Sequence, residues 1–149
     1  MIKYINKRVV LEHLDAYKDI TYYVTFVDIG HRCGYVQANI DCQECRDNFD
    51  VHGGITYNDS RESPEFPEIN GINFIGFDAA HGYDYRDIDF MKIYFPENSL
   101  QIDCAARCNV IFGDYFDAKI RTLDYMISEC KSLIDQIEAM PKCEHVVNH

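Results

Sequence analysis

The sequence contains no tryptophan, few basic residues and no long apolar run. None of its hydrophobic stretches is near the length of about 18 residues that a membrane-spanning helix needs. Charged residues interrupt segment 1–17 before an apolar core can form, so we expect no secretory signal peptide. Both absences lead us to expect a cytoplasmic protein.

The balance of charge argues against one large class of function. The chain has 14 Lys and Arg against 25 Asp and Glu, which gives a formal net charge of −11. Direct binding to nucleic-acid phosphates is disfavoured, because it needs clustered basic side chains. A protein with a basic surface is a more natural partner, since complementary charges speed encounter. The alternative is that the charge only keeps the protein dispersed in solution.

Motifs of several enzyme classes are also missing. The sequence has no G-x-S-x-G segment and no glycine-rich phosphate-binding loop, so nucleophilic catalysis has little support. What the chain does have is a large apolar fraction, with 47% hydrophobic residues that include 11 Tyr and 9 Phe. A length of 149 residues with this composition predicts one folded domain over residues 1–149.

Several segments have the β-branched and aromatic content of strands. We predict strands over 20–27, 33–40, 48–58, 72–78 and 89–96. A turn-like segment around Gly30 joins the first two of these, which favours a hairpin. The first 20 residues fit either a short strand or a helix. Segment 58–71 contains two prolines and several acidic residues and is expected to be a surface loop.

The C-terminal region has the clearest helical pattern. Apolar residues recur there at every third or fourth position: Ile120, Leu123, Ile127, Cys130, Ile134 and Ile137. Asp114 or Asp117 can cap the start, and Pro141 is expected to stop the helix after Met140. Strands followed by a long helix indicate an α+β fold, with a mostly antiparallel sheet and the C-terminal helix packed across it. The alternative is a helix that binds a partner.

One short segment, GFDAAHGYD over residues 76–84, holds an aspartate and a histidine three positions apart between glycines. A turn after Asp78 would bring its carboxylate close to the imidazole of His81. His52 lies beside another pair of glycines, and Cys33 begins another predicted strand. Thiolate, imidazole and carboxylate groups are all zinc ligands, so these four residues form a candidate zinc site. The alternative is that each is a separate polar residue at a strand end.

The seven cysteines offer a second candidate metal site. Cys42 and Cys45 form a C-x-x-C pair, and Cys104 and Cys108 form another short pair. Two such pairs can hold zinc, although their wide separation in the sequence weakens the prediction. A redox role for the first pair has less support, because no thioredoxin-like strand and helix surround it.

Three motifs together carry a resemblance to a known family. The segments GHRCGYV (30–36), VHGGITY (51–57) and GFDAAH (76–81), followed by RTLDYMISECKSLIDQI (121–137), resemble a widespread family of small phage and prophage proteins, mostly of unknown function. The chain is also similar to anti-CRISPR proteins that contain zinc and inhibit type II-A CRISPR nucleases. Many relatives have a cysteine where this chain has Ala79. The family's polar motif positions correspond here to His31, Cys33, His52, Asp78 and His81, and the resemblance supports a metal at the last four.

The resemblance implies a small acidic phage protein that acts in the cytoplasm of the host cell. It would bind a basic nucleic-acid-binding protein, a Cas9-type nuclease, and block its use of DNA, with a metal ion holding the fold and no catalysis required. The candidate contact residues come from two acidic segments: Asp59, Glu62, Glu65, Glu68, Asp84, Asp87 and Asp89.

Two other functions stay open. A metal-dependent hydrolase that acts on a nucleotide or another small molecule would use three protein ligands and leave one metal position for water. His31 or Asp84 would then be the general base. A phage structural or accessory protein would need no metal at all.

Overall fold

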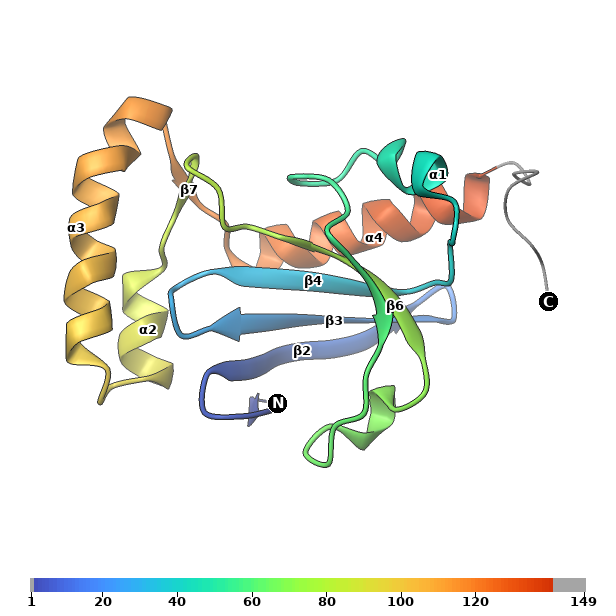
Figure 1. Cartoon of the computed structure of the whole chain (residues 1–149), viewed down its shortest axis with the longest axis horizontal. Coiled ribbons are helices and arrows are strands. Elements are labelled where there is room, and N and C mark those ends of the chain that lie inside the picture. The colour runs from blue at the N-terminus through green and yellow to red at the C-terminus, as the bar shows by residue number, and fades with distance from the viewer. Residues whose placement is uncertain (1, 141–149) are drawn as a thin grey trace.

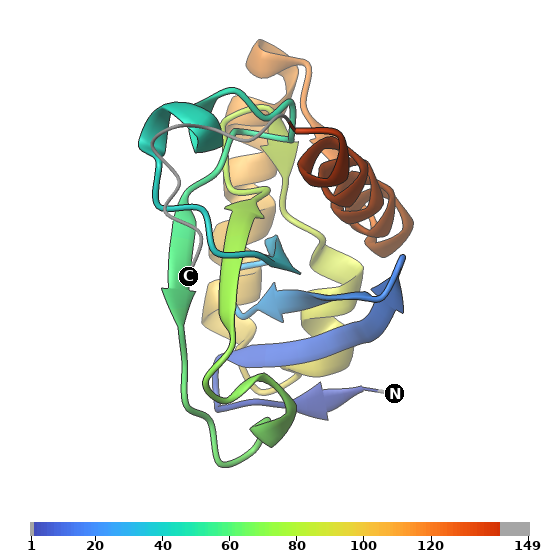
Figure 2. The same ribbon diagram turned by 90° about the vertical axis from the view of Figure 1, so that its right-hand side faces the viewer.

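A strongly twisted antiparallel sheet forms the centre of the molecule. The computed structural model describes residues 2–140, without the side chains at positions 114 and 115. Within that range, six strands pair in the order β1-β2-β3-β4-β6-β5, and each neighbouring pair is antiparallel. The strands are β1 (Lys3–Tyr4), β2 (Val9–Tyr17), β3 (Ile20–Val27), β4 (Arg32–Gln37), β5 (Tyr57–Ser60) and β6 (Asn73–Asp78). β5 and β6 run across the direction of β2, β3 and β4 (Figures 1 and 2).

One long helix, α4 (Leu123–Ala139), packs across one face of this sheet and contacts β2, β3 and β4. Its buried residues are Met126, Cys130, Leu133 and Ile134. The helix comes close at Gly34 of β4, where an added Cβ would lie 3.0 Å from the Cys130 sulfur. The predicted α+β fold, with a mostly antiparallel sheet and a C-terminal helix packed across it, is therefore confirmed.

The opposite face and one end of the sheet have their own apolar clusters. Tyr23, Tyr35, Phe66 and Phe74 pack together on the opposite face, beneath the loop that contains the short 3₁₀ helix η1 (Pro67–Ile69). At one end of the sheet lie α2 (Ile88–Tyr94) and α3 (Ser99–Phe116), side by side (Figure 1). The short helix α1 (Gln43–Asp47) lies at the other end.

Two segments differ from the sequence prediction. Segment 89–96 is helical rather than extended, because Asp87 caps the start of α2 and accepts a hydrogen bond from the Phe90 N–H. Segment 48–58 is a loop up to β5, because Gly53 and Gly54 both have positive φ angles that turn the chain. The strands expected at 20–27 and 72–78 are confirmed by β3 and β6.

The ends of the predicted helix also need correction. Thr122, rather than Asp114 or Asp117, caps the start of α4, because its side chain accepts a hydrogen bond from the Tyr125 N–H. Ile120 lies outside the helix, in the short strand β8 (Lys119–Ile120), and is exposed. The helix ends at Ala139, and Pro141 lies outside the described residues.

Candidate metal centre

His52 is held against the first turns of α4. It follows Val51 in the loop before β5. Its backbone N–H donates to Glu129 Oε1 at 2.9 Å, and its Nδ1 lies 2.8 Å from the Tyr125 hydroxyl oxygen. These two contacts fix both the backbone and the ring of His52, so that Nε2 points away from the helix and toward Asp84.

Asp84 and His81 belong to one tight turn after β6. The Asp84 N–H donates to the His81 carbonyl at 2.9 Å. Asp84 also begins β7 (Asp84–Tyr85), which pairs in parallel with β8 just before α4. Because both ends of the turn are anchored, its two side chains have defined positions beside His52.

The Asp84 carboxylate is the centre of the cluster. It is buried and lies 2.9 Å from His52 Nε2 and 3.0 Å from His81 Nδ1. The His81 backbone N–H donates to it at 3.1 Å, and Arg121 Nε donates at 2.8 Å. Burial alone would raise the pKa of Asp84, but the hydrogen bonds from His52, His81 and Arg121 outweigh it and hold the pKa well below its usual range. Asp84 is therefore a carboxylate at neutral pH.

Gly53 makes room for the second histidine. Its φ angle is +71°, and an added Cβ would lie only 2.3 Å from the Cε1 atom of His81. Any other residue at this position would both strain the backbone and displace the ring. The glycine after His52 is thus part of the structure that brings the two imidazoles together.

Three side chains could hold a metal ion. One ligand atom each from His52, His81 and Asp84 lies within 4.8 Å of the other two. Two ligands at 2.0–2.1 Å from a tetrahedral zinc ion lie about 3.3 Å apart. His52 Nε2 and His81 Nδ1 each lie 3.0 Å from the same oxygen, Asp84 Oδ2, which is close to that spacing. The three residues thus form a hydrogen-bonded cluster whose spacing is also compatible with a metal ion.

The outer atoms of both imidazoles also have partners of the kind that orient metal-binding histidines. His52 Nδ1 faces the Tyr125 hydroxyl, and His81 Nε2 lies 3.8 Å from Asp78 Oδ1. Arg121 plays the same part for Asp84. The ligand group is therefore held by a second layer of polar contacts.

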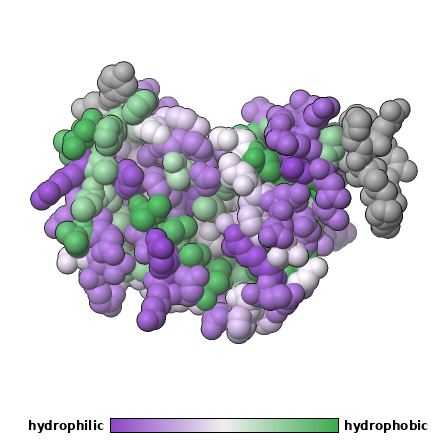
Figure 3. Space-filling model, viewed as in Figure 1, coloured by the Kyte–Doolittle hydropathy of each residue, from purple (hydrophilic) through white to green (hydrophobic). Residues whose placement is uncertain are grey.

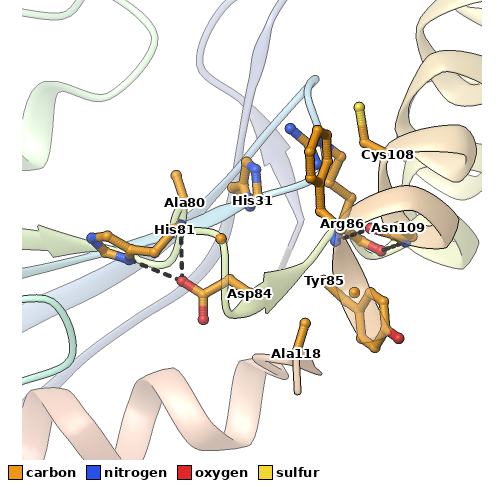
Figure 4. Close-up of a pocket in the computed structure, with 12 residues that line it drawn as sticks. His31, Ala80, His81, Asp84, Tyr85, Arg86, Cys108, Asn109 and Ala118 are labelled. Atoms are coloured by element: carbon orange, nitrogen blue, oxygen red, sulfur yellow. Dashed lines mark hydrogen bonds and ion pairs between the residues drawn. The ribbon is translucent and has the colours of Figure 1, made fainter. Parts of the chain in front are cut away.

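A cavity of about 150 Å³ opens beside His81 and Asp84 (Figure 4). Arg86 and Asn109 lie in its wall. The Asn109 amide both accepts from the Arg86 backbone N–H and donates to the Arg86 carbonyl, each at 2.9 Å. Among the described side chains, none forms a hydrogen bond or ion pair with the Arg86 guanidinium, and Arg86 lines the cavity.

His31, a candidate general base, also lines this cavity. Its side chain is buried, and its Nδ1 has no hydrogen-bond partner among the described residues. Burial and the nearby Arg86 lower the pKa of His31, so the ring is neutral at pH 7. The ring also has a backbone hydrogen bond with Ala79, so it is the Nδ1 atom that can accept from a ligand hydroxyl or a water molecule.

The structure separates the other two predicted ligands from the three-residue group. Cys33 packs with the aromatic cluster on the sheet face opposite α4, whereas His52 contacts α4 itself. Burial raises the pKa of Cys33 to about 11, so it is a thiol rather than a thiolate. Asp78 pairs with Cys33 across β4 and β6 and accepts a hydrogen bond from Thr56 at 3.0 Å. Asp78 thus lies beside His81 without joining the ligand group.

The acidic residues proposed as partner contacts fall into two groups. Asp84 and Asp87 are buried and form ion pairs within the chain, so they are not the surface residues that we expected. The remaining five are exposed: Asp59, Glu62, Glu65, Glu68 and Asp89.

The two cysteine pairs lie far apart. Cys42 caps α1 and Cys45 lies within it, whereas Cys104 and Cys108 lie on α3 at the other end of the sheet (Figure 1). Within the described part of the chain, the only group of metal-ligand side chains that lies close enough to hold an ion is the one around Asp84. The four cysteines do not form a single site.

Sequence reasoning missed three members of the centre. The sequence suggests Asp84 as a partner contact or a general base but not as a metal ligand, and it suggests no role for Arg121 or Tyr125. The available signal was the spacing: His81 and Asp84 are three residues apart, as are Asp78 and His81. Choosing between the two aspartates required the position of β7 beside β8.

Within residues 2–140, none of the helices combines the length and hydrophobicity needed to cross a membrane. No protein-family model matches the chain, and comparison with curated proteins and with solved structures also gives no match.

Proposed function

We propose that this chain is a zinc-binding protein in which His52, His81 and Asp84 hold the ion. The observation that carries the proposal is the convergence of these three side chains, whose ligand atoms lie within 4.8 Å of one another. Imidazole nitrogen and carboxylate oxygen are usual zinc ligands, and zinc accepts three of them with a fourth position open. The experiment that tests it is metal analysis of the purified protein, with His81→Ala as the variant that loses the ion.

We further propose that the protein acts by binding a basic nucleic-acid-binding protein, such as a Cas9-type nuclease, in the cytoplasm of the host cell. The net charge of −11 supports this proposal. So does the acidic loop, which we define as Asp59, Glu62, Glu65 and Glu68, all exposed. Complementary charge would speed association and compete with nucleic acid for the same basic surface.

The acidic loop and the metal centre lie at opposite ends of β6 (Figure 1). Binding to a Cas9-type nuclease is therefore testable separately from zinc. Neutralising the loop (Asp59→Asn, Glu62→Gln, Glu65→Gln and Glu68→Gln together) should weaken binding at least about tenfold. The matched control removes four other exposed charges: Glu44→Gln, Asp47→Asn, Asp50→Asn and Asp124→Asn. Affinity that is unchanged between low and high salt would contradict the electrostatic mechanism.

A metal-dependent hydrolase is the second candidate, and a specific observation favours it. Only three ligands converge, so a bound zinc ion would keep one position for water and lower its pKa to about 7. The adjoining cavity contains Arg86, whose guanidinium suits a phosphate group. Zinc-dependent cleavage of a nucleotide phosphodiester probe, lost in a folded His81→Ala variant, would support this function. Absence of zinc-dependent turnover in the zinc-loaded protein would count against it.

A further inference from the structure

α3 presents an exposed, largely apolar outer face that packs against no other element in the described part of the chain. Residues on this face are exposed, whereas Ile102 and Ala105 on the inner face are buried. We call the outer set the α3 stripe: Leu100, Asp103, Cys104, Arg107, Val110 and Ile111. Their spacing of three or four places them on one side of the helix. Figure 3 shows apolar side chains along the left edge of the molecule, where α3 lies.

The exposure of this stripe is unusual for a folded domain. Leu100, Val110 and Ile111 are 74%, 78% and 66% exposed. A shallow depression of about 300 Å³ lies between Ala106, Arg107, Val110 and Ile111. Large contiguous apolar patches on soluble proteins usually mark interaction sites. The depression is wide enough for an apolar side chain from another helix.

The α3 stripe also carries one charge of each sign. Asp103 and Arg107 are both exposed, and neither side chain forms a hydrogen bond or an ion pair within the described part of the chain. The two charges lie between Leu100 on one side and Val110 with Ile111 on the other. The order along the helix is thus apolar, acidic, basic, apolar.

When a second α3 runs in the opposite direction, each charged residue of this order faces a residue of opposite charge, and each apolar end faces an apolar end. If the outer faces of two α3 helices pack antiparallel about a two-fold axis at the level of position 105, position 103 faces position 107, and position 100 faces position 110. Asp103 of each copy then meets Arg107 of the other, and each Leu100 meets Val110 beside the depression. A two-fold interface repeats every contact, so both the ion pair and the apolar contact occur twice.

We propose that the protein forms a homodimer through antiparallel packing of the α3 stripes of two copies. The charge pairs set the direction and register of the helices, as flanking charges do in coiled coils. The apolar residues supply most of the affinity. The acidic loop and the metal centre are built from other segments, so the proposal does not depend on zinc or on the acidic partner.

Charge reversal gives a specific test by sedimentation over a range of protein concentrations. Asp103→Arg and Arg107→Asp should each weaken the dimer at least tenfold, because each replaces two attractive contacts with two repulsive ones. The double variant should dimerise again. A mixture of the two single variants should form a heterodimer, since one copy then carries two arginines and the other two aspartates. Asp47→Arg on α1 is the control for the change in net charge of Asp103→Arg, and Arg61→Asp is the control for Arg107→Asp.

All variants lie at exposed positions, so thermal melting should show that each remains folded. A wild-type chain that stays monomeric over the whole concentration range would overturn the proposal and leave the stripe to a different partner. A dimer that both single reversals leave intact would also overturn it. Failure of the double variant and of the mixture to restore association would reject the antiparallel register.

Discussion

This protein contains two buried clusters of charged residues with different properties. The Arg32 cluster consists of Arg32, Glu12, Asp87 and Tyr94, and the Asp84 cluster consists of Asp84, His52, His81 and Arg121. Both contain buried carboxylates with several hydrogen-bond donors. They differ in the nature of those donors and in their access to a cavity.

The Arg32 cluster is closed. The guanidinium binds both oxygens of Glu12 at 2.7 and 3.2 Å, binds Asp87 at 2.7 Å, and lies over the rings of Phe26 and Phe90. An arginine is permanently charged, and here it is only 2% exposed. The guanidinium makes four hydrogen bonds within the chain, and the cluster holds β2, β4 and the start of α2 together.

The Asp84 cluster is open by comparison. Two of its donors are imidazoles, which can release a proton and bind a metal in its place. The His81 side chain is 27% exposed, and the cavity lies directly beside it. The comparison shows that burial of charge alone does not identify a site. Exchangeable donors next to an accessible space distinguish the candidate metal centre from the structural cluster.

Arg121 physically connects the two clusters. Its backbone carbonyl accepts a hydrogen bond from Arg32 at 3.1 Å, and its side chain donates to Asp84 at 2.8 Å. The closed cluster therefore positions one of the groups that orient the open one. We expect substitution of Arg32 to disturb both clusters, and substitution of His52 or His81 to disturb only the Asp84 cluster.

The largest effect is expected for Arg32→Met. It leaves two buried carboxylates without their cation, and we expect the free energy of unfolding to fall by about 3–5 kcal/mol. Lys18→Met is the control, because Lys18 and its partner Asp135 are both exposed and their ion pair should contribute little to stability. Denaturant unfolding measures both. Similar losses for the two variants would contradict the structural role of the Arg32 cluster.

The next effect is expected for His81→Ala. Loss of a direct ligand should weaken zinc binding by more than about 100-fold, because changes to outer contacts alone cost 10- to 100-fold. The metal-free protein should lose only about 1 kcal/mol of unfolding free energy, since one hydrogen bond is removed from a partly exposed side chain. Zinc titration calorimetry and denaturant unfolding give the two quantities. Complete unfolding of the metal-free variant would instead mark His81 as a structural residue.

A smaller effect is expected for Gly53→Ala. The new Cβ would displace the His81 ring, so zinc affinity should fall about 10-fold. Gly54→Ala is a close control, because Gly54 also has a positive φ, +79°, but an added Cβ there meets no atom within 4 Å. Both variants strain the backbone, but only Gly53→Ala also displaces the His81 ring, so only Gly53→Ala should lose zinc affinity. Equal affinities in the two variants would remove His81 from the ligand group.

The smallest effect concerns acid stability of the metal-free protein. The folded pKa of Asp84 lies below the unfolded value of about 3.9, so its contribution is complete above that pH and is lost as the pH falls toward the folded pKa. The wild type should lose about 1 kcal/mol more unfolding free energy than Asp84→Asn between about pH 4 and pH 3. Equal pH slopes for the two proteins would show that Asp84 is not held as a carboxylate.

Local patterns were enough to predict much of the fold. β3 and β6 follow from runs of β-branched and aromatic residues, and α4 follows from its apolar periodicity. The same reasoning failed for α2, because aromatic residues at helical spacing resemble a strand in a short window. It missed α3, whose outer face is apolar although it is exposed, so that the usual two-sided pattern is lost.

The candidate site was only partly predictable for a different reason. His52 and His81 stand beside glycines, which is a local signal. Cys33 could not be excluded without the pairing of β4, which turns its side chain to the other face of the sheet. Asp84 could not be selected without the pairing of β7 with β8, which buries it between the two histidines. Tertiary contacts therefore decide that Asp84 is a proposed ligand and that Cys33 is not.

The most direct test of the central claim is X-ray absorption spectroscopy of the zinc-loaded protein. We expect one zinc ion per chain, with nitrogen and oxygen ligands only, at about 2.0–2.1 Å. A sulfur ligand at about 2.3 Å would contradict it and return Cys33 or another cysteine to the site. Failure of the chain to bind zinc at all would reject the metal centre built around Asp84.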